Sequence, residues 1–324
     1  MGAHAGCQRA SLYATAIANR PLIAHVLDEL AAGGITHARL VAPPEVNRDL
    51  GRVLAAEGPL GIEVSHADAA ASSARQAVLC EVERALSQGD VILHPGDGLF
   101  GSGQVGEMRA RIEAGDVDSV LPAPADVDPV RRTGQRRASE AIMALGRRTR
   151  SLVAEMRALD DEADDLMSVL LVSQCRLAVC AARDHWRYSD TTEVLLEANR
   201  LVLDRLQAAP RDGATGENNR IRGQVALSAS AFVSNCVIQG PVTIDERAVL
   251  EDSFIGPYTA IGPDAILSGA EIDNSMVLAG AEVRHPGSRI EGSILGERSQ
   301  VVRSFDLPTG LHLRLGPDAR LSLS

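Results

Sequence analysis

The sequence predicts an α/β domain built on a mostly parallel sheet, followed by a parallel β-helix. In residues 1–209, strand-like and helix-like segments alternate, and this order favours a parallel sheet with helices on both faces. In residues 224–324, apolar residues recur six apart, a period typical of parallel β-helices. The segment between them, "PRDGATGENNRIRG" (210–223), is polar and rich in turn-forming residues, so it is predicted to be a linker.

Apolar spacing predicts the elements of the first 209 residues. They are, in order, a helix over 20–34, a strand over 36–42, a helix over 47–58, a strand over 60–67, a helix over 73–90, a strand over 91–94, and helices over 154–173 and 189–209. The first helix has Pro21 at a favourable starting position and Gly33 and Gly34 where it should end. Its apolar face consists of Leu22, Val26, Leu27 and Leu30.

The β-helix is predicted from runs of apolar residues at a six-residue spacing. The runs are Ile238, Ile244 and Leu250, then Ile255, Ile261 and Leu267, then Val277 and Val283. Similar segments, "SNCVI", "EDSFIG", "DNSMVL" and "EGSILG", recur about three hexads apart and indicate three or four coils. Residues 307–324, "LPTGLHLRLGPDARLSLS", are predicted to cap the open end.

Charge and composition exclude several classes of partner. The formal net charge of −11 and the pI of about 5.2 argue against nucleic acid or an anionic membrane. No stretch approaches ~20 apolar residues, and the N-terminal stretch lacks the apolar core of a signal peptide. The five cysteines, an odd number without a CxxC pair, indicate reduced thiols, so we expect a cytoplasmic protein.

All 32 basic residues are arginine, and the 324 residues contain no lysine. Lysine is a compact point charge that often holds a phosphate during transfer, whereas arginine is a planar fork. Any mechanism that requires a lysine side chain is therefore excluded. Seven arginines lie close together in the sequence, and they could form either an anion-binding site or a solvated surface. They are Arg131, Arg132, Arg136, Arg137, Arg147, Arg148 and Arg150.

Residues 91–103 read "VILHPGDGLFGSG", and Asp97 lies in the turn after the predicted strand. A carboxylate just past the carboxyl end of a strand is a common position for a metal or phosphate site in α/β proteins. The neighbouring "GSGQVG" (101–106) matches the GxGxxG pattern of dinucleotide-binding loops. That pattern needs its first glycine directly after a strand, and here six residues intervene, so we interpret it as a surface loop.

Four segments together resemble the sugar-1-phosphate nucleotidyltransferases. "IANRPLIAHVLDELAAGGI" is similar to that family's first helix, and "VILHPGDGLF" to its metal-binding Gly-Asp loop. "HWRYSDTTEVLLEANRLVLDRL" resembles its Trp-x-Asp-x-Gly segment and the helix that follows, and "DSFIGPYTAIGPDA" its β-helix. The resemblance covers most of the chain and points to the long-form glucose-1-phosphate thymidylyltransferases of actinomycetes. It implies a Rossmann-like domain, a left-handed β-helix and an oligomer.

The family transfers a nucleotidyl group to a sugar phosphate, which requires groups that hold phosphates and carboxylates that hold a divalent metal. By the resemblance, Asp97 occupies the position of the first metal ligand, whereas Tyr188 replaces the second. Asp190 lies two residues further on and would need a shifted backbone to reach the site. The signature lysine falls near Leu12, and the glutamine that reads the base falls near Asp68.

Other parts of the family's phosphate site are also absent by this comparison. The residues before the first predicted helix are too few and too polar for the family's first strand and glycine-rich loop. A second family lysine is expected between Val120 and Ala163, where this sequence has "RRTGQRRASEAIMALGRRTR". By this comparison, the differences affect the metal ligands, the phosphate-binding groups and the residue that reads the base.

The leading hypothesis is a degenerate relative without pyrophosphorylase activity that acts as a binding or regulatory subunit. It would form homo-oligomers or hetero-oligomers with a paralogue and could bind a nucleotide or sugar phosphate. The alternative is an active, rewired nucleotidyltransferase on an unusual substrate, with Mg²⁺ on Asp97 and Asp190 and phosphate on Arg131, Arg132, Arg136 and Arg137. A third interpretation is a hexapeptide acyltransferase that uses His285 or His312 as a base. No cofactor is assigned, except Mg²⁺ if the chain is active.

Overall fold

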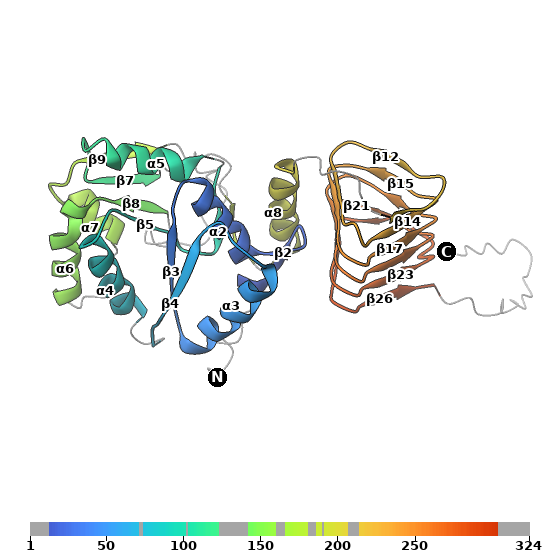
Figure 1. Ribbon diagram of the computed structural model, residues 1–324, viewed down its shortest axis with the longest axis horizontal. Helices are drawn as coiled ribbons and strands as arrows, with labels where there is room; N and C mark the ends of the chain where they lie inside the picture. The colour runs from blue at the N-terminus through green and yellow to red at the C-terminus, as the bar shows by residue number, and fades with distance from the viewer. Residues whose placement is uncertain are drawn as a thin grey trace, which may run out of the picture.

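The computed structural model describes residues 13–70, 74–101, 103–122, 142–159, 166–180, 186–189, 191–206 and 214–303. Figure 1 shows an α/β region on one side, a solenoid of short strands on the other, and helix α8 between them. The predicted fold class is confirmed, because mixed helices and strands with parallel pairing are followed by a β-solenoid of about five turns. Within the described ranges, no helix combines the length and the hydropathy needed to cross a membrane.

The α/β region begins with a short hairpin and continues as helices and strands. Its elements are β1 (Ala16–Ile17), β2 (Arg20–Pro21), α2 (Leu22–Ala32), β3 (His37–Ala42), α3 (Pro44–Glu57), β4 (Glu63–Asp68), α4 (Ala74–Leu86), β5 (Val91–Leu93), β6 (Gly98–Leu99), α5 (Gln104–Glu113), β7 (Ser119–Pro122), β8 (Met143–Leu145), the 3₁₀ helix η4 (Arg147–Thr149), α6 (Arg150–Leu159), α7 (Leu166–Val172), β9 (Leu177–Cys180), β10 (Trp186–Arg187) and α8 (Thr192–Asp204).

The ends of the helices follow from local chemistry. Pro21 pairs with Ala16 in the β1–β2 hairpin and directly precedes α2, so this helix begins at Leu22, two residues after the start of the predicted range. The helix ends at Gly33, where an added Cβ would lie 2.3 Å from Cγ1 of Val105, so the glycine allows α2 and α5 to approach closely. The N-terminus of α8 is capped by Thr191, whose hydroxyl accepts a hydrogen bond from a backbone amide of the first turn.

The longer strands of the α/β region form two sheets among the described residues. One contains β3 and β4, which pair in parallel. The other has the order β5-β8-β7-β9, in which β7 and β9 are parallel and β8 is antiparallel to both of its neighbours. β8, which the apolar spacing did not predict, therefore makes this sheet mixed. Helices α2 and α5 share one apolar core with these strands, and α4 and α6 share another.

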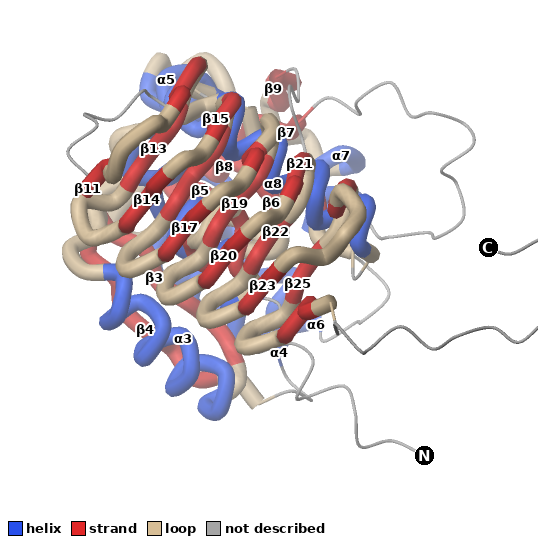
Figure 2. The backbone as a smooth tube through the Cα atoms, turned by 90° about the vertical axis from the view of Figure 1, so that its right-hand side faces the viewer, coloured by secondary structure: helices blue, strands red, loops and turns tan. Residues whose placement is uncertain are grey.

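The solenoid stacks its strands into three parallel sheets. The first sheet holds β11 (Ala214–Thr215), β14 (Phe232–Ser234), β17 (Val249–Glu251), β20 (Ile266–Ser268), β23 (Glu282–Arg284) and β26 (Gln300–Val302). The second holds β12 (Arg220–Arg222), β15 (Val237–Gln239), β18 (Phe254–Ile255), β21 (Glu271–Asp273) and β24 (Ile290–Glu291). The third holds β13 (Val225–Leu227), β16 (Val242–Ile244), β19 (Thr259–Ile261), β22 (Met276–Val277) and β25 (Ile294–Leu295). Figure 2 shows β14, β17, β20 and β23 following one another along the stack.

The hexapeptide prediction is confirmed at each apolar position that it named. All are at most 1% exposed, namely Ile238, Ile244, Leu250, Ile255, Ile261, Leu267, Val277 and Val283. Strand pairing places equivalent residues of neighbouring coils side by side, and the hydrogen bond from the Arg247 amide to the Ser230 hydroxyl spans 17 residues. This coil is therefore one residue shorter than three complete hexads.

Two solenoid strands lie inside the segment predicted to be a linker. β11 pairs with β14, and β12 pairs with β15, so the first coil begins before residue 224. The turn-forming residues that indicated a linker include corners of this coil. Asn218 and Gly223 have φ angles of 61° and 78°, in the left-handed region that asparagine and glycine tolerate best.

Polar side chains join the solenoid to the α/β region around α8. The buried Asn199 of α8 accepts a hydrogen bond from the Ala18 amide (3.0 Å) and donates one to the Tyr258 carbonyl (2.9 Å). Asn19, in the β1–β2 hairpin, donates to the Ile261 carbonyl at 2.7 Å. The hairpin and α8 are thus both hydrogen-bonded to the third sheet of the solenoid and its corners.

We expect Asp118 to make stability depend on pH below about pH 4. Its side chain accepts hydrogen bonds from the Arg176 side chain and amide, and these bonds lower the pKa of the carboxyl to about 2. A lowered folded-state pKa stabilises the fold above the unfolded pKa, and this contribution is lost as the pH falls toward 2. Urea unfolding at stepped pH should show a smaller loss over this window in Asp118→Asn than in the unaltered chain. The matched control, Asp116→Asn, should keep the full loss.

Candidate functional site

Asp97 lies in the loop that joins β5 to β6, past the carboxyl end of β5 as the sequence predicts. The loop is tight, because the ring Nδ1 of His94 accepts a hydrogen bond from the Gly96 amide at 2.9 Å. Gly96 has a φ angle of 81°, which favours glycine. An added Cβ at Gly96 would also lie 3.3 Å from the Tyr13 ring, so this loop and the start of the described chain are in contact.

The Asp97 carboxylate is bound by Arg187. Strand β10 pairs antiparallel with β6, which places Arg187 opposite Gly98. From there Nη2 of Arg187 donates to both carboxylate oxygens of Asp97, at 2.9 and 2.6 Å. The backbone is bonded as well, since the Tyr188 amide donates to the Asp97 carbonyl at 2.9 Å. The two segments are therefore joined through main chain and side chains.

Neighbouring residues hold β10 against β6. Gly98 is required because an added Cβ would lie 2.8 Å from the Trp186 carbonyl oxygen. Trp186 is 3% exposed, and its ring N–H donates to the Val194 carbonyl of α8 at 2.8 Å. The chain on either side of Arg187 is thus fixed by packing and hydrogen bonds, and the guanidinium is held on the carboxylate.

The pair lies in a mostly buried position. The side chains of Arg187 and Asp97 are 18% and 20% exposed. Opposite charges attract more strongly when water is largely excluded, and the guanidinium offsets the negative charge that would attract a metal ion. Arg187 therefore supplies the positive charge at Asp97 from within the chain.

Several residues predicted to form the site fall outside the described ranges. They are Asp190, Arg131, Arg132, Arg136, Arg137, Leu12 and His312. Three arginines of the predicted cluster are described, and each contacts an acidic side chain. Arg148 pairs with Asp118 at 3.5 Å, Arg150 lies 4.0 Å from Glu83, and the Arg147 amide donates to Asp90.

The remaining predicted residues have other contacts. The Tyr188 ring packs edge-on against the Trp186 ring, with 6.5 Å between the ring centroids. Asp68 accepts a hydrogen bond from the Asn47 side chain at 2.8 Å. His285 occupies a solenoid corner with a φ angle of 46°, and its ring lies where a side chain at Gly269 would project.

Arg187 is the residue that inspection of the sequence missed. It stands between Trp186 and Tyr188, in the stretch that resembles the Trp-x-Asp-x-Gly segment. The available signal was a basic residue next to the position of a lost metal-binding carboxylate. Its contact with Asp97 spans 90 residues and depends on the pairing of two two-residue strands, which carry no periodic pattern.

Comparison with known proteins links this architecture to sugar-nucleotide chemistry. The chain is 23% identical over 332 residues to a glucose-1-phosphate thymidylyltransferase of Streptomyces antibioticus, covering 95% of this chain and 92% of the relative. It is also 23% identical over 334 residues to the low-salt glycan biosynthesis nucleotidyltransferase Agl11 of Haloferax volcanii, covering 95% of this chain and 92% of that relative. The chain is a homologue of the sugar nucleotidyltransferases. No protein-family model matches it.

A shorter match adds local detail to this relationship. A glucose-1-phosphate thymidylyltransferase of Streptomyces griseus is 32% identical over 141 residues, which are 43% of this chain and 39% of that protein. Identity in the long alignments is low. Homology to sugar nucleotidyltransferases therefore establishes descent, and the residues at Asp97 must be assessed on their own chemistry.

The described residues of this sugar nucleotidyltransferase homologue do not fit a divalent metal at Asp97. Mg²⁺ binds through carboxylate, phosphate and water oxygens in near-octahedral geometry. Both Asp97 oxygens accept hydrogen bonds from a guanidinium, which would repel a cation placed beside it. Within the described ranges, no three His, Cys, Asp or Glu side chains are grouped closely enough to hold a metal.

Proposed function

We propose that this homologue does not catalyse nucleotidyl transfer and acts as a binding or regulatory subunit. The observation that carries the proposal is the ion pair between Asp97 and Arg187, at 2.6 Å. The carboxylate that resemblance assigns to the metal is held by an arginine from the segment that should supply the second ligand. Tyr188, which follows that arginine, has no carboxylate to offer.

Charge balance supports the same conclusion. Nucleotidyl transfer brings phosphate oxygens of two substrates together, and enzymes offset this charge with metal ions and basic side chains. The chain contains no lysine to hold a phosphate as a point charge. Arg187, the basic residue at Asp97, is already engaged with the carboxylate. A substrate phosphate that approached Arg187 would compete with Asp97 for the guanidinium.

The subunit role includes a partner, either a second copy of this chain or a paralogue. Support comes from exposed apolar side chains at the end of α7 and in β9, the strand that ends the mixed sheet in the order of described strands. More than half of each of these side chains is exposed, and they are Leu171, Val172 and Val179. Large exposed apolar side chains favour association with a partner surface.

The second candidate is an active nucleotidyltransferase with an unusual substrate, and the names of the relatives favour it. It would use Mg²⁺ and require Asp97 to leave Arg187 when substrate binds. The two candidates differ in what Asp97 does. In a subunit Asp97 stabilises the fold through Arg187, whereas in an enzyme it also supports turnover.

Asp97→Asn separates the two candidates. We expect the purified chain to release no pyrophosphate from nucleoside triphosphates and sugar 1-phosphates with Mg²⁺, and to show no Mg²⁺-dependent rise in melting temperature. We expect Asp97→Asn to lower the free energy of unfolding by about 1–3 kcal/mol, because a neutral amide cannot maintain the largely buried ion pair with Arg187. Urea denaturation measures this loss.

The control is Asp264→Asn, which removes a carboxylate from an exposed ion pair with Arg247 on the solenoid. It should change stability less than Asp97→Asn. Pyrophosphate release by the unaltered chain that disappears in Asp97→Asn and persists in Asp264→Asn would refute the subunit proposal and establish the enzyme.

A further inference from the structure

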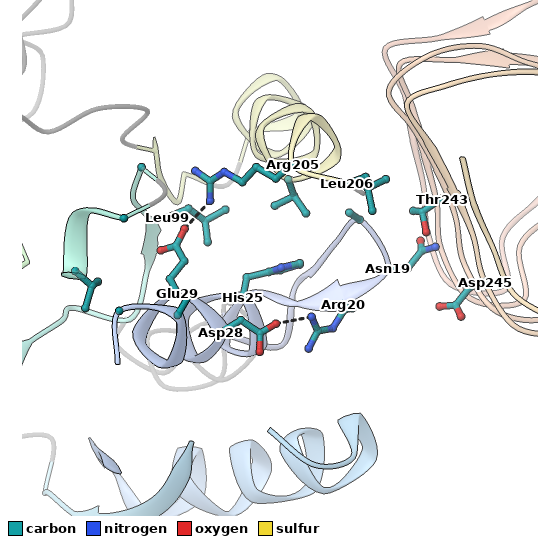
Figure 3. A pocket seen from close by; sticks show the side chains of 17 residues that line it. Asn19, Arg20, His25, Asp28, Glu29, Leu99, Arg205, Leu206, Thr243 and Asp245 are labelled. Carbon is teal, nitrogen blue, oxygen red and sulfur yellow. Dashed lines mark hydrogen bonds and ion pairs between the residues drawn. The ribbon is translucent and has the colours of Figure 1, made fainter. Parts of the chain in front are cut away.

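A cavity of about 500 Å³ lies between the α/β region and the solenoid (Figure 3). Helix α2, the end of α8 and the chain after β6 line one side, and Thr243 and Asp245 of the solenoid line the other. This volume is in the range of sites for small organic ligands. Neither Asp97 nor Arg187 lines the cavity, so it is separate from the site described above.

The two described arginines that line this cavity, Arg20 and Arg205, both pair with carboxylates. Arg20 pairs with Asp28 at 2.6 Å, and Arg205 pairs with Glu29 at 2.7 Å, as the dashed lines of Figure 3 show. Arg20 also pairs with Glu57 at 2.9 Å. A phosphate would compete with these carboxylates for the two arginines and would be repelled by them. The charges therefore disfavour an anionic ligand.

Three acceptor atoms at the cavity receive no hydrogen bond from a described residue. The side-chain N–H group of Asn19 donates to a solenoid carbonyl, so its amide oxygen remains available as an acceptor. The Nε2 atom of His25 lies 2.8 Å from a carbonyl, which only accepts, so Nε2 carries the proton and Nδ1 is an acceptor. One oxygen of Asp245 accepts from the next backbone amide, which leaves the other. The cavity therefore suits a ligand that donates hydrogen bonds.

Burial makes the cavity favour uncharged groups. It is the largest cause that lowers the pKa of His25 and raises the pKa values of Glu29 and Asp245. The rest of the wall is largely apolar and includes Leu99, Val105, Val202 and Leu206. A ligand with one apolar face and several hydroxyl groups matches both parts of this lining.

We propose that this cavity binds a neutral, hydroxyl-rich ring, such as an unphosphorylated monosaccharide. Ring hydroxyls donate to Asn19, His25 and Asp245, and the C–H face of the ring packs on the apolar wall. Because Asp245 lies on the solenoid and His25 on α2, the bound ring contacts both regions and stabilises their arrangement.

The test is binding of glucose, galactose and mannose to the full chain, measured by saturation-transfer NMR and calorimetry. Asp245→Ser replaces the carboxylate by a shorter, weaker hydroxyl acceptor at a position where serine is accommodated, since Ser228 precedes it by one coil in the register of β13 and β16. Leu206→Trp fills the cavity. We expect saturable binding of at least one hexose, weakened about tenfold or more in both variants.

One control defines the outcomes. Glu297→Ser removes a solenoid carboxylate away from the cavity, so it should bind the hexose as the unaltered chain does. Absence of saturable binding for all three hexoses, or binding that survives both Asp245→Ser and Leu206→Trp, would overturn the proposal. Tighter binding of glucose 1-phosphate than of glucose, lost in Leu206→Trp, would also overturn it, because the cavity would then accept an anion.

Discussion

Leu250→Ala is expected to reduce the free energy of unfolding by about 3 kcal/mol. Leu250 is fully buried, and strand pairing places it between Val233 and Leu267 in the inward row of the first solenoid sheet. Truncation removes three methyl or methylene equivalents and leaves a cavity that the stacked coils cannot close without breaking strand pairing. Chemical denaturation followed by circular dichroism measures the loss.

Val249→Ala provides the matched control on the same strand. Val249 points to the opposite face of β17 and is half-buried, so its truncation should lower the free energy of unfolding by about 1 kcal/mol or less. If both variants lost the same amount, the inward row would not consist of the residues that the six-residue spacing selects, and the register of this sheet would be wrong.

The solenoid was predictable because its core repeats. Each coil places one large apolar side chain inward from each side, so the spacing of Ile238, Ile244 and Leu250 is a direct consequence of three flat sides. The first coil was missed because its strands are short and polar outside, as in "RIR" of β12. Polar corners such as Asn218 resemble a linker when no neighbouring coil is visible.

The α/β region was predictable only where elements are long. Helices α2, α3, α4 and α8 carry apolar faces of several turns, and the parallel strands β3 and β4 carry apolar residues. The two-residue strands β6 and β10 carry no such pattern, and their pairing depends on the whole fold. The position of Asp97 was therefore evident from the sequence, but its contact with Arg187 was not.

Asn199→Leu is the second substitution with a large expected effect, a loss of about 2–4 kcal/mol in the free energy of unfolding. Asn199 is fully buried between the α/β region and the solenoid. Leucine has a similar size, but it leaves the Ala18 amide and the Tyr258 carbonyl without their hydrogen-bond partner. Each buried polar group without a partner is costly because it has lost its hydrogen bonds to water.

Arg200→Ala tests whether the effect depends on burial and not merely on contact between the two regions. Arg200 is the next residue of α8, donates to the Asn274 side chain at 2.8 Å, and lies over the Tyr258 ring, but it is exposed. Water can replace its contacts, so its removal should change stability much less than Asn199→Leu. Equal losses in the two variants would show that the buried hydrogen bonds of Asn199 do not hold the regions together. A larger loss in Asn199→Leu, with the solenoid and α/β region unfolding in separate steps, would show that they do.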